Sequence, residues 1–338
     1  MWTDPKIGRE RVVKSLVTGS NGFIGSHFVD YLLERGHEVR CLIRKTSNLR
    51  WIKHLPVEFM YGDVTDALTL PPAVVGVDYV FHLGGTVRAR DEAEFFRINH
   101  GGTLNLLEAC KKHNANLKRF VLASSQAAAG PAISMSPVDE DDESRPISMY
   151  GRSKRAAEIA VMDYARILPV TIVRPPSVYG ERDDDVLELF RYVKLGIKML
   201  VGRGDKYISV IYIGDLLRGI YLAATSPRSI GETYFLTNLE SVSSGDIQDV
   251  IASTLHKKTL TIRLPEFLID FYAWISETTA RFRKRVAIVN KDKALEMKQA
   301  YWLVDGSRAV SHLGFKAEVS LEDGIKKTAD WYISQGWL

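Results

Sequence analysis

A glycine-rich turn near the start of the chain constrains the fold more than any other feature of the sequence. Residues 17–25 have the sequence VTGSNGFIG, which places Gly19, Gly22 and Gly25 in the spacing G-x-x-G-x-x-G. An apolar run precedes this segment and a helical pattern follows it. Glycines permit a tight turn that a pyrophosphate can approach, and a helix N-terminus offers unpaired N–H groups to an anion. The segment therefore predicts a phosphate-binding strand, turn and helix, with a purely structural turn as the alternative.

Short apolar runs alternate with helical patterns through the first half of the chain. The runs are rich in Val, Ile and Phe, as buried strands are, and the segments between them carry apolar residues at i, i+3 and i+4. The expected strands are Val12–Thr18, Val39–Ile43, Val57–Tyr61, Tyr79–Leu83, Phe120–Ala123 and Thr171–Val173, and the expected helices are His27–Arg35, Phe95–His113 and Tyr150–Ile167. This alternation predicts an α/β fold with a Rossmann-type, doubly wound parallel sheet, in which ligands lie beyond the C-terminal strand ends.

The alternation becomes irregular after Pro175 and Pro176. Helices are expected near Val186–Leu195, Asp215–Ala224, Ser244–Leu255, Glu266–Arg281 and Leu321–Ser334, with strand-like pieces at Ile208–Ile213 and Tyr234–Leu236. We therefore expect a cofactor-binding Rossmann domain over 1–175 and a smaller, mixed α/β substrate lobe over 176–338. Because later segments could return to the first domain, the boundary is approximate.

Composition excludes several classes of protein. Apolar residues make up 46% of the chain and charged residues 25%, which is typical of an ordinary globular protein. The net charge is only +4 and no long Lys/Arg block occurs, so nothing indicates a nucleic-acid partner. Two cysteines, Cys41 and Cys110, give neither a disulfide framework nor metal-ligand spacing, and no metal site is predicted. Without an apolar N-terminal signal, we expect a cytoplasmic protein.

Basic residues follow the second expected strand. An NAD site normally has Asp or Glu at this strand end, where it binds the ribose hydroxyls, whereas an Arg accommodates a 2′-phosphate. Here the strand is followed by Arg44 and Lys45, and no acid takes that place. This favours NADP over NAD, with a solvated basic turn as the alternative.

Tyr150 and Lys154 lie four residues apart at the start of an expected helix. Residues at i and i+4 share a face of a helix, so both side chains can point into one cleft. An ammonium group favours the phenolate of a neighbouring Tyr, and the pair can then act as a general acid–base on a substrate oxygen. Taken alone, the same spacing also occurs on solvated helices. Another polar residue, His82, ends the fourth expected strand, where we expect a packed histidine rather than a catalytic one.

Together these motifs resemble the extended short-chain dehydrogenase/reductase superfamily, also called the NAD-dependent epimerase/dehydratase family. The resemblance covers most of the chain, and its landmarks occur in the family's order. They are Thr18 to Gly25, Gly62-Asp63-Val64, Phe81 to Gly85, Asn99 with Gly101 to Glu108, Ser124-Ser125, Tyr150 with Lys154, and Arg174 to Gly180. Among the branches of the superfamily, the chain is most similar to the hydroxysteroid-dehydrogenase-like and flavonoid-reductase-like enzymes.

The resemblance implies roles for individual residues. Catalysis is expected from Ser125, Tyr150 and Lys154, with Ser124 as a less favoured substitute for Ser125. Asp63 and Val64 are expected to border the adenine, and Pro176 to Val178 the nicotinamide carboxamide. The full set expected to bind the cofactor is Gly19, Asn21, Gly22, Phe23, Ile24, Gly25, Arg44, Lys45, Asp63, Val64, Leu83, Gly84, Gly85, Asn99, Tyr150, Lys154, Pro176 and Val178.

Residues near the expected site reduce the number of possible reaction types but do not identify the substrate. Dehydratases of this family place Asp-Glu after the catalytic Ser or Thr, whereas Gln126 and Ala127 follow Ser125 here. Sugar-nucleotide epimerases carry a diphosphate-binding Arg at the position of Ile208, although Lys206 or Arg203 could supply that charge. The first hypothesis is an NAD(P)-dependent oxidoreductase that interconverts a secondary alcohol and a ketone on a hydrophobic, lipid-, sterol- or polyketide-like substrate. The alternatives are a nucleotide-sugar 4-epimerase with tightly bound NAD and a non-enzymatic cofactor sensor.

Two further expectations concern partners. By resemblance, the helices expected at Phe95–His113 and Tyr150–Ile167 form the contact of a homodimer. The aromatic stretch Leu264–Ile275, followed by basic residues from Arg281 to Arg285, predicts an apolar helix. Such a helix fits the surface of a membrane, here the inner membrane, or the mouth of a lipid-sized pocket, and core packing is the simpler alternative.

Overall fold

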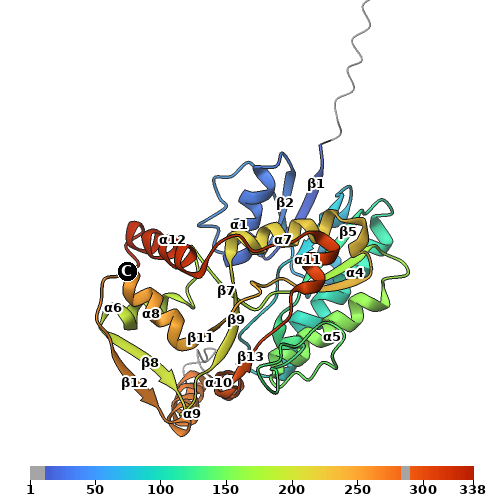
Figure 1. The fold of residues 1–338 in the computed structure, drawn as a ribbon. Helices are drawn as coiled ribbons and strands as arrows, with labels where there is room; N and C mark the ends of the chain where they lie inside the picture. The colour runs from blue at the N-terminus through green and yellow to red at the C-terminus, as the bar shows by residue number, and fades with distance from the viewer. Residues whose placement is uncertain (1–11, 283–289) are drawn as a thin grey trace, which may run out of the picture.

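A seven-stranded parallel sheet forms the centre of the larger domain (Figure 1). The computed structural model describes residues 12–282 and 290–338. The order of the strands is β10-β6-β5-β4-β1-β2-β3, and every neighbouring pair is parallel. The strands are β1 (Lys14–Thr18), β2 (Glu38–Ile43), β3 (Glu58–Tyr61), β4 (Tyr79–His82), β5 (Arg119–Ala123), β6 (Val170–Arg174) and β10 (Glu232–Phe235). This sheet confirms the predicted Rossmann-type fold.

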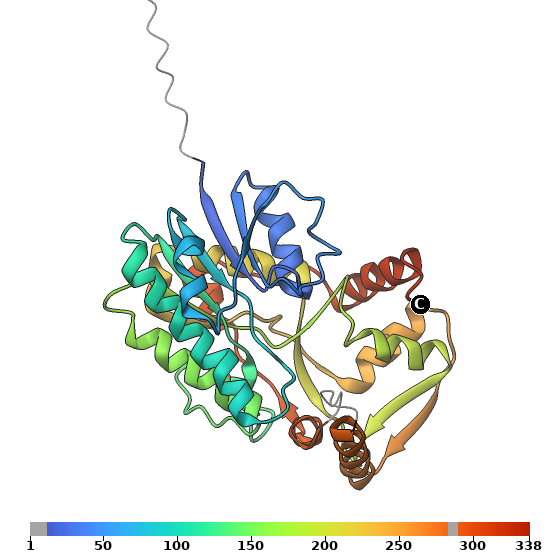
Figure 2. The same cartoon turned by 180° about the vertical axis from the view of Figure 1, so that it is seen from behind.

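Helices cover both faces of the sheet, as Figures 1 and 2 show from opposite sides. On one face, α1 (Phe23–Leu33), α7 (Ile213–Thr225) and α11 (Ser307–Leu313) pack through Phe28, Leu216 and Ala309. On the other face, α2 (Pro71–Val74), α4 (Gly102–His113) and α5 (Met149–Asp163) supply a second apolar core. The strands are therefore buried on both faces, which explains their continuous apolar runs.

The helix expected over Phe95–His113 is not uniform. It consists of α3 (Glu92–Phe95), a wider π-helical turn (Phe96–Gly101) and α4. Within the π-helical turn, the buried Asn99 side chain donates hydrogen bonds to the Ser153 hydroxyl (2.9 Å) and the Thr86 carbonyl (3.0 Å). It also accepts one from the Thr86 N–H (2.8 Å). Such widened turns are frequent at functional sites, and this one connects α5 to the loop after β4.

The second half of the chain builds a smaller lobe from two small sheets and several helices. One sheet contains β11, β9 and β13 with β7 beside β9, and the other pairs β12 with β8. The strands are β7 (Ser177–Tyr179), β8 (Ile197–Val201), β9 (Tyr207–Tyr212), β11 (Ser241–Ser243), β12 (Leu260–Leu264) and β13 (Tyr301–Trp302). The helices are α6 (Leu187–Lys194), α8 (Ser244–Thr254), α9 (Glu266–Phe282), α10 (Lys291–Lys298) and α12 (Leu321–Ser334).

Segments from beyond residue 175 also join the larger sheet. Strand β10 overlaps the expected strand Tyr234–Leu236, and it pairs with β6 instead of remaining in the smaller lobe. Its Tyr234 and Phe235 are fully buried, which fits a strand covered on both sides. Because α7 and α11 pack beside it, the larger domain is discontinuous in sequence. The exact division of the chain at 175 remains a prediction.

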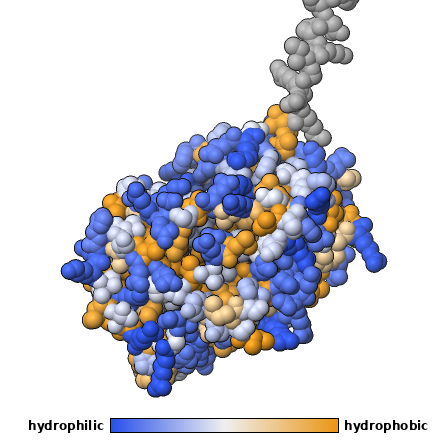
Figure 3. Space-filling model, viewed as in Figure 1, coloured by the Kyte–Doolittle hydropathy of each residue, from blue (hydrophilic) through white to orange (hydrophobic). Residues whose placement is uncertain are grey.

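The aromatic segment predicted near Leu264 forms α9. The basic residues Arg283 to Arg285 lie outside the described part of the chain. None of the helices within the described residues has the length and apolar character that a membrane span requires. Hydrophilic residues cover much of the face drawn in Figure 3, with hydrophobic residues between them.

Candidate active site

The glycine turn brings the ends of two strands and the start of α1 into close contact. Gly19 has a φ of +69°, and a Cβ placed there would lie 2.6 Å from the Cα of Gly84. A Cβ on Gly25 would lie 2.1 Å from the carbonyl oxygen of Gly19. Only glycine fits at both positions, because the backbones touch where any side chain would begin. The turn therefore has the backbone approach that a phosphate-binding loop requires.

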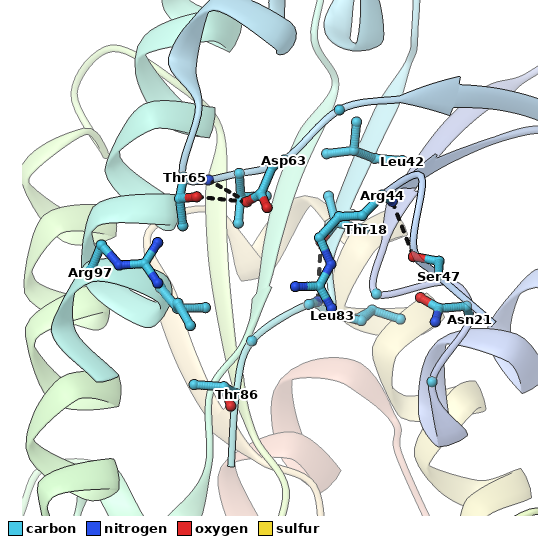
Figure 4. Close-up of a pocket in the computed structure, with 17 residues that line it drawn as sticks. Thr18, Asn21, Leu42, Arg44, Ser47, Asp63, Thr65, Leu83, Thr86 and Arg97 are labelled. Carbon is cyan, nitrogen blue, oxygen red and sulfur yellow. Dashed lines mark hydrogen bonds between the residues drawn. The ribbon is translucent and has the colours of Figure 1, made fainter. Parts of the chain in front are cut away.

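A cavity of about 400 Å³ opens beyond the C-terminal ends of β1, β2, β3 and β4 (Figure 4). Nine of its lining residues are in the predicted cofactor set: Gly19, Asn21, Gly22, Arg44, Asp63, Val64, Leu83, Gly84 and Gly85. The sequence interpretation missed the lining residues Thr18, Leu42, Ser47, Gly62, Thr65, Thr86, Arg97 and Ile98. This is the edge at which parallel sheets bind ligands, and the glycine cradle fits a dinucleotide.

Two arginines reach this cavity from different elements. Arg44 follows β2 and is exposed, and its backbone N–H bonds to the Ser47 hydroxyl (3.1 Å). Arg97 comes from the π-helical turn, and its guanidinium lies 3.7 Å from Glu94. Figure 4 shows the two guanidinium groups approaching the cavity from opposite sides. Lys45 is exposed but does not line the cavity. Among the residues that the structure describes, no acid forms an ion pair with Arg44, so its charge is available to an anion.

A second cavity, of about 380 Å³, is lined by two of the three predicted catalytic residues, Ser125 and Tyr150, but not by Lys154. Its wall includes Ser125, Tyr150 and Pro176, whereas Ser124 is buried behind it. The Ser125 Oγ accepts a hydrogen bond from the Ala127 N–H (3.1 Å), which fixes the hydroxyl beside the cavity. Lys154 is buried, and its Nζ donates to the carbonyl oxygen of Ala123 (2.6 Å). The geometry favours Ser125 over Ser124 for contact with a substrate.

Burial dominates the electrostatics of the Tyr150–Lys154 pair. It raises the pKa of Tyr150 to about 12, although hydrogen bonding with Ser125 acts in the opposite direction. Burial also lowers the pKa of Lys154 to about 8, against the attraction of Glu158. The sequence interpretation expected Lys154 to favour the phenolate. With a pKa of about 12 Tyr150 is protonated at neutral pH, and the effect of Lys154 on its phenolate remains a prediction.

Helix α10, which the sequence interpretation did not predict, anchors the N-terminus of α5. The carboxylate of Asp292 accepts hydrogen bonds from the N–H groups of Met149 (2.7 Å) and Tyr150 (3.3 Å). The Ser148 hydroxyl accepts from the Gly151 N–H (3.0 Å) and donates to Glu296 (2.7 Å). These bonds satisfy donors that a helix leaves free at its first turn, and they hold Tyr150 in place.

The other predicted residues line neither cavity but surround them. Asn99 supports the loop at Gly85, where a Cβ would lie 3.0 Å from the Asn99 Oδ1. Phe23, Ile24 and Gly25 belong to the first turns of α1, and Val178 lies in β7. Their contacts with a cofactor remain predictions.

His82 is a packed histidine, as its position predicts. Its ring nitrogens bond to the hydroxyls of Thr18 (2.7 Å) and Thr103 (3.0 Å), and it is almost fully buried. Burial lowers its pKa to about 3, so the ring is neutral in the physiological range. Within residues 12–282 and 290–338, no group of three or more His, Cys, Asp or Glu side chains is arranged to hold a metal ion.

Gln126 is a further residue whose role the sequence did not reveal. It lines the second cavity and is only 8% exposed. Its Oε1 is buried and has no hydrogen-bond partner among the described residues. A buried acceptor left unpaired is costly, so it suits a donor group on a bound substrate. In the sequence, the position of Gln126 directly after Ser125 indicated that it lies near the site. The sequence interpretation used this residue only as an argument against dehydratase activity.

The remainder of the second cavity is lined by both apolar and polar side chains, and its lysines have partners. Lys206 donates to the Lys298 carbonyl (2.7 Å), and Lys293 lies 3.1 Å from Glu296. Ile208 lines the cavity at the position where sugar-nucleotide epimerases carry an Arg. The apolar lining comprises Leu189, Met199, Val201, Ile208, Ile247, Met297 and Trp302.

Comparisons with known proteins agree with this geometry. The sequence model of the NAD dependent epimerase/dehydratase family matches residues 15–236. A ceramide reductase from Caulobacter vibrioides is 28% identical over 334 residues, which cover 95% of each chain. A 2-alkyl-3-oxoalkanoate reductase from Shewanella oneidensis is 26% identical over 94% of this chain and 86% of its own length. A UDP-glucose 4-epimerase from Thermotoga maritima shares the fold, with a TM-score of 0.79 and 23% identity over 96% of this chain and 99% of its own.

The anchoring of α5 leads to a stability prediction. Replacing Asp292 by Ala leaves the Met149 and Tyr150 N–H groups without their acceptor, so the free energy of unfolding should fall by about 0.5–2 kcal/mol. Urea denaturation measures this loss. Lys291→Ala, at an exposed neighbouring position of α10, is the matched control and should change stability little. Equal stability of the two variants would show that Asp292 does not hold the helix.

Proposed function

The chain belongs to the NAD-dependent epimerase/dehydratase family of enzymes, and we propose that it reduces a ketone on a hydrophobic, long-chain substrate with NADPH. The main supporting observation is the second cavity, in which Ser125 and Tyr150 share the lining with seven large apolar residues and both lysines contact protein acceptors. A nucleotide diphosphate would need a free cation there. Two relatives named as ceramide and 2-alkyl-3-oxoalkanoate reductases support a lipid-like ketone.

Each residue of the site has a defined part in this proposal. NADPH, when bound, would supply the hydride for the carbonyl carbon. Tyr150 would donate its proton to the carbonyl oxygen, Ser125 would hold that oxygen by a hydrogen bond, and Lys154 would hold the ribose of the cofactor. Because the pKa of Tyr150 is raised to about 12, the group is protonated at neutral pH and can donate its proton to the carbonyl oxygen.

A stoichiometric assay separates this function from the alternative. We expect one NADPH to be consumed for each molecule of a 3-keto long-chain amide or acid that is reduced. Tyr150→Phe should slow turnover about 10²–10⁴-fold while NADPH affinity stays nearly unchanged, because only the proton donor is lost. A nucleotide-sugar 4-epimerase, which the shared fold leaves as a second candidate, would interconvert sugars without net NADPH consumption. Such turnover, or full activity of Tyr150→Phe, would refute the proposal.

We also propose that Arg44 gives NADP preference over NAD. A charge-assisted contact with a phosphate contributes about 1.5–3 kcal/mol, which corresponds to roughly a tenfold to hundredfold preference. Arg44→Asp should reverse this preference, and calorimetric titration with the two cofactors measures it. The exposed Lys45 does not line the cavity, so Lys45→Asp is the matched control with a smaller expected effect. Equal affinity of the unchanged protein for NADP and NAD would contradict the proposal.

The depressed pKa of Lys154 predicts a pH dependence of cofactor binding. Burial lowers this pKa to about 8, so the ammonium is present below pH 8 and is lost as the pH rises through it. NADPH affinity, measured by fluorescence between about pH 7 and 10, should weaken above about pH 8. In Lys154→Met the affinity should be lower and level across this window. The same alkaline fall in that variant would assign it to another group.

A homodimer through α4 and α5 completes the proposal. These helices expose Leu104, Ile159, Met162 and the nearby Ile167, with 36–55% of each residue accessible. Ile159→Glu should convert a dimer into a monomer, since it places a charge in an apolar contact. Light scattering at micromolar concentration measures the mass. Ile230→Glu, at another exposed isoleucine, is the control and should remain dimeric.

A further inference from the structure

Helix α9 turns its apolar side outward. Its buried side is narrow and consists mainly of Ile269 and Ala273, which pack on Ala294 of α10 and on Val201 and Leu264. Six large apolar residues, called here the outer face of α9, remain 38–68% exposed: Phe267, Leu268, Phe271, Tyr272, Trp274 and Ile275. A surface helix of a globular protein normally buries such residues, so this face is adapted to an apolar partner.

Charge on α9 is arranged so that the outer face carries no acid. Asp270 bonds to Lys298 of α10 (2.8 Å), and Glu266 lies 3.8 Å from Lys206. Glu277 accepts a hydrogen bond from the Lys291 N–H (2.8 Å). All three acids therefore contact protein cations or donors, and Glu266 and Asp270 remain about half exposed beside the buried side of the helix.

Exposed apolar residues and an arginine surround the outer face of α9. Strand β12, which leads into α9, exposes Leu260 (72%) and Ile262 (38%). Its Arg263 is exposed next to the start of the helix, where it contacts the carbonyl of Arg203 (3.4 Å) and forms an exposed ion pair with Asp205 (3.4 Å). An aromatic helix with neighbouring cations is the composition of helices that lie in the headgroup region of an anionic bilayer.

The size of the face favours lipid over a second copy of the chain. Its six side chains expose on the order of 600 Å² in a ridge one helix wide, while a stable protein interface buries about 800 Å² per partner. The stacked rings of Phe271 and Trp274, with centroids 6.0 Å apart, form a ridge on this helix. A ridge of aromatic rings can insert among lipid headgroups without a matching protein groove.

We propose that the outer face of α9 binds peripherally to an anionic lipid surface. The elements beneath it also form the second cavity, since β8 contributes Met199 and Val201, and α10 contributes Lys293, Glu296 and Met297. Lipid contact by α9 would thus hold the wall of the substrate cavity against the membrane. The proposal rests on the geometry of α9 and stands apart from the reaction, because its test measures no turnover.

Vesicle flotation tests the proposal on the full chain. The intact protein should float with vesicles of phosphatidylcholine and phosphatidylglycerol in equal amounts, and several-fold less with phosphatidylcholine alone. The double variant Phe271→Ser/Trp274→Ser should lose at least about tenfold of its partitioning, and Arg263→Glu several-fold. Phe271→Leu/Trp274→Leu keeps the face apolar and should retain most of the binding.

A matched control distinguishes binding by the outer face of α9 from nonspecific binding by other exposed apolar residues. Leu68 (90% exposed) and Ile133 (84%) are the most exposed large apolar residues described, and neither lies near α9 in the sequence. The double variant Leu68→Ser/Ile133→Ser should float like the intact protein. Failure of the intact protein to float, or equal losses in this control and in the α9 variant, would overturn the proposal. So would a drop in mass of the α9 variant by light scattering, since that result would assign the face to a second copy.

Discussion

Hydrogen bonds from α10 fix the first turn of α5, the helix that carries Tyr150 and Lys154. The N–H groups at a helix N-terminus have no partner within the helix, and here Asp292 supplies acceptors for two of them. Glu296 adds a bond to the capping Ser148. These carboxylates come from the smaller lobe, whereas Tyr150 and Lys154 come from the larger domain. The placement of the acid–base pair therefore depends on contacts made across the whole length of the chain.

Burial of this pair then determines its chemistry. Tyr150 is held protonated with its pKa at about 12, while the pKa of Lys154 falls to about 8. A water-filled site would leave both groups closer to their ordinary pKa values. The buried Glu158 counters the loss of charge on Lys154, and Arg174 binds Glu158 through two bonds of 2.8 Å. Lys154, Glu158 and Arg174 thus form one buried electrostatic arrangement.

The sequence predicted the strands and turns that are determined by residues close together in the chain. Val, Ile and Phe runs identified the central strands because these strands are buried on both faces, and Gly19 and Gly25 identified the turn because no side chain fits there. Strands β8 and β12 and helix α10 escaped prediction, since they are short or exposed and are stabilised by distant partners. Arg97 was missed for a related reason: the π-helical turn directs it into the first cavity, and helical periodicity does not reveal such a turn. The sequence indicated a strand at β10 but left open which domain it joins, because local pattern does not indicate which sheet a strand joins.

Helix α9 also shows what local sequence pattern does not predict. An amphipathic pattern predicts that a helix has an apolar side, but only the fold determines whether that side faces the protein or the solvent. Ile269 and Ala273 are small enough to pack against Ala294, so α9 rests on α10 through its narrow side and its aromatic side remains outside. Because α10 also carries Asp292 and Glu296, a single helix connects α9 to the N-terminus of α5. A lipid surface that binds α9 would therefore act on the same contacts that position Tyr150.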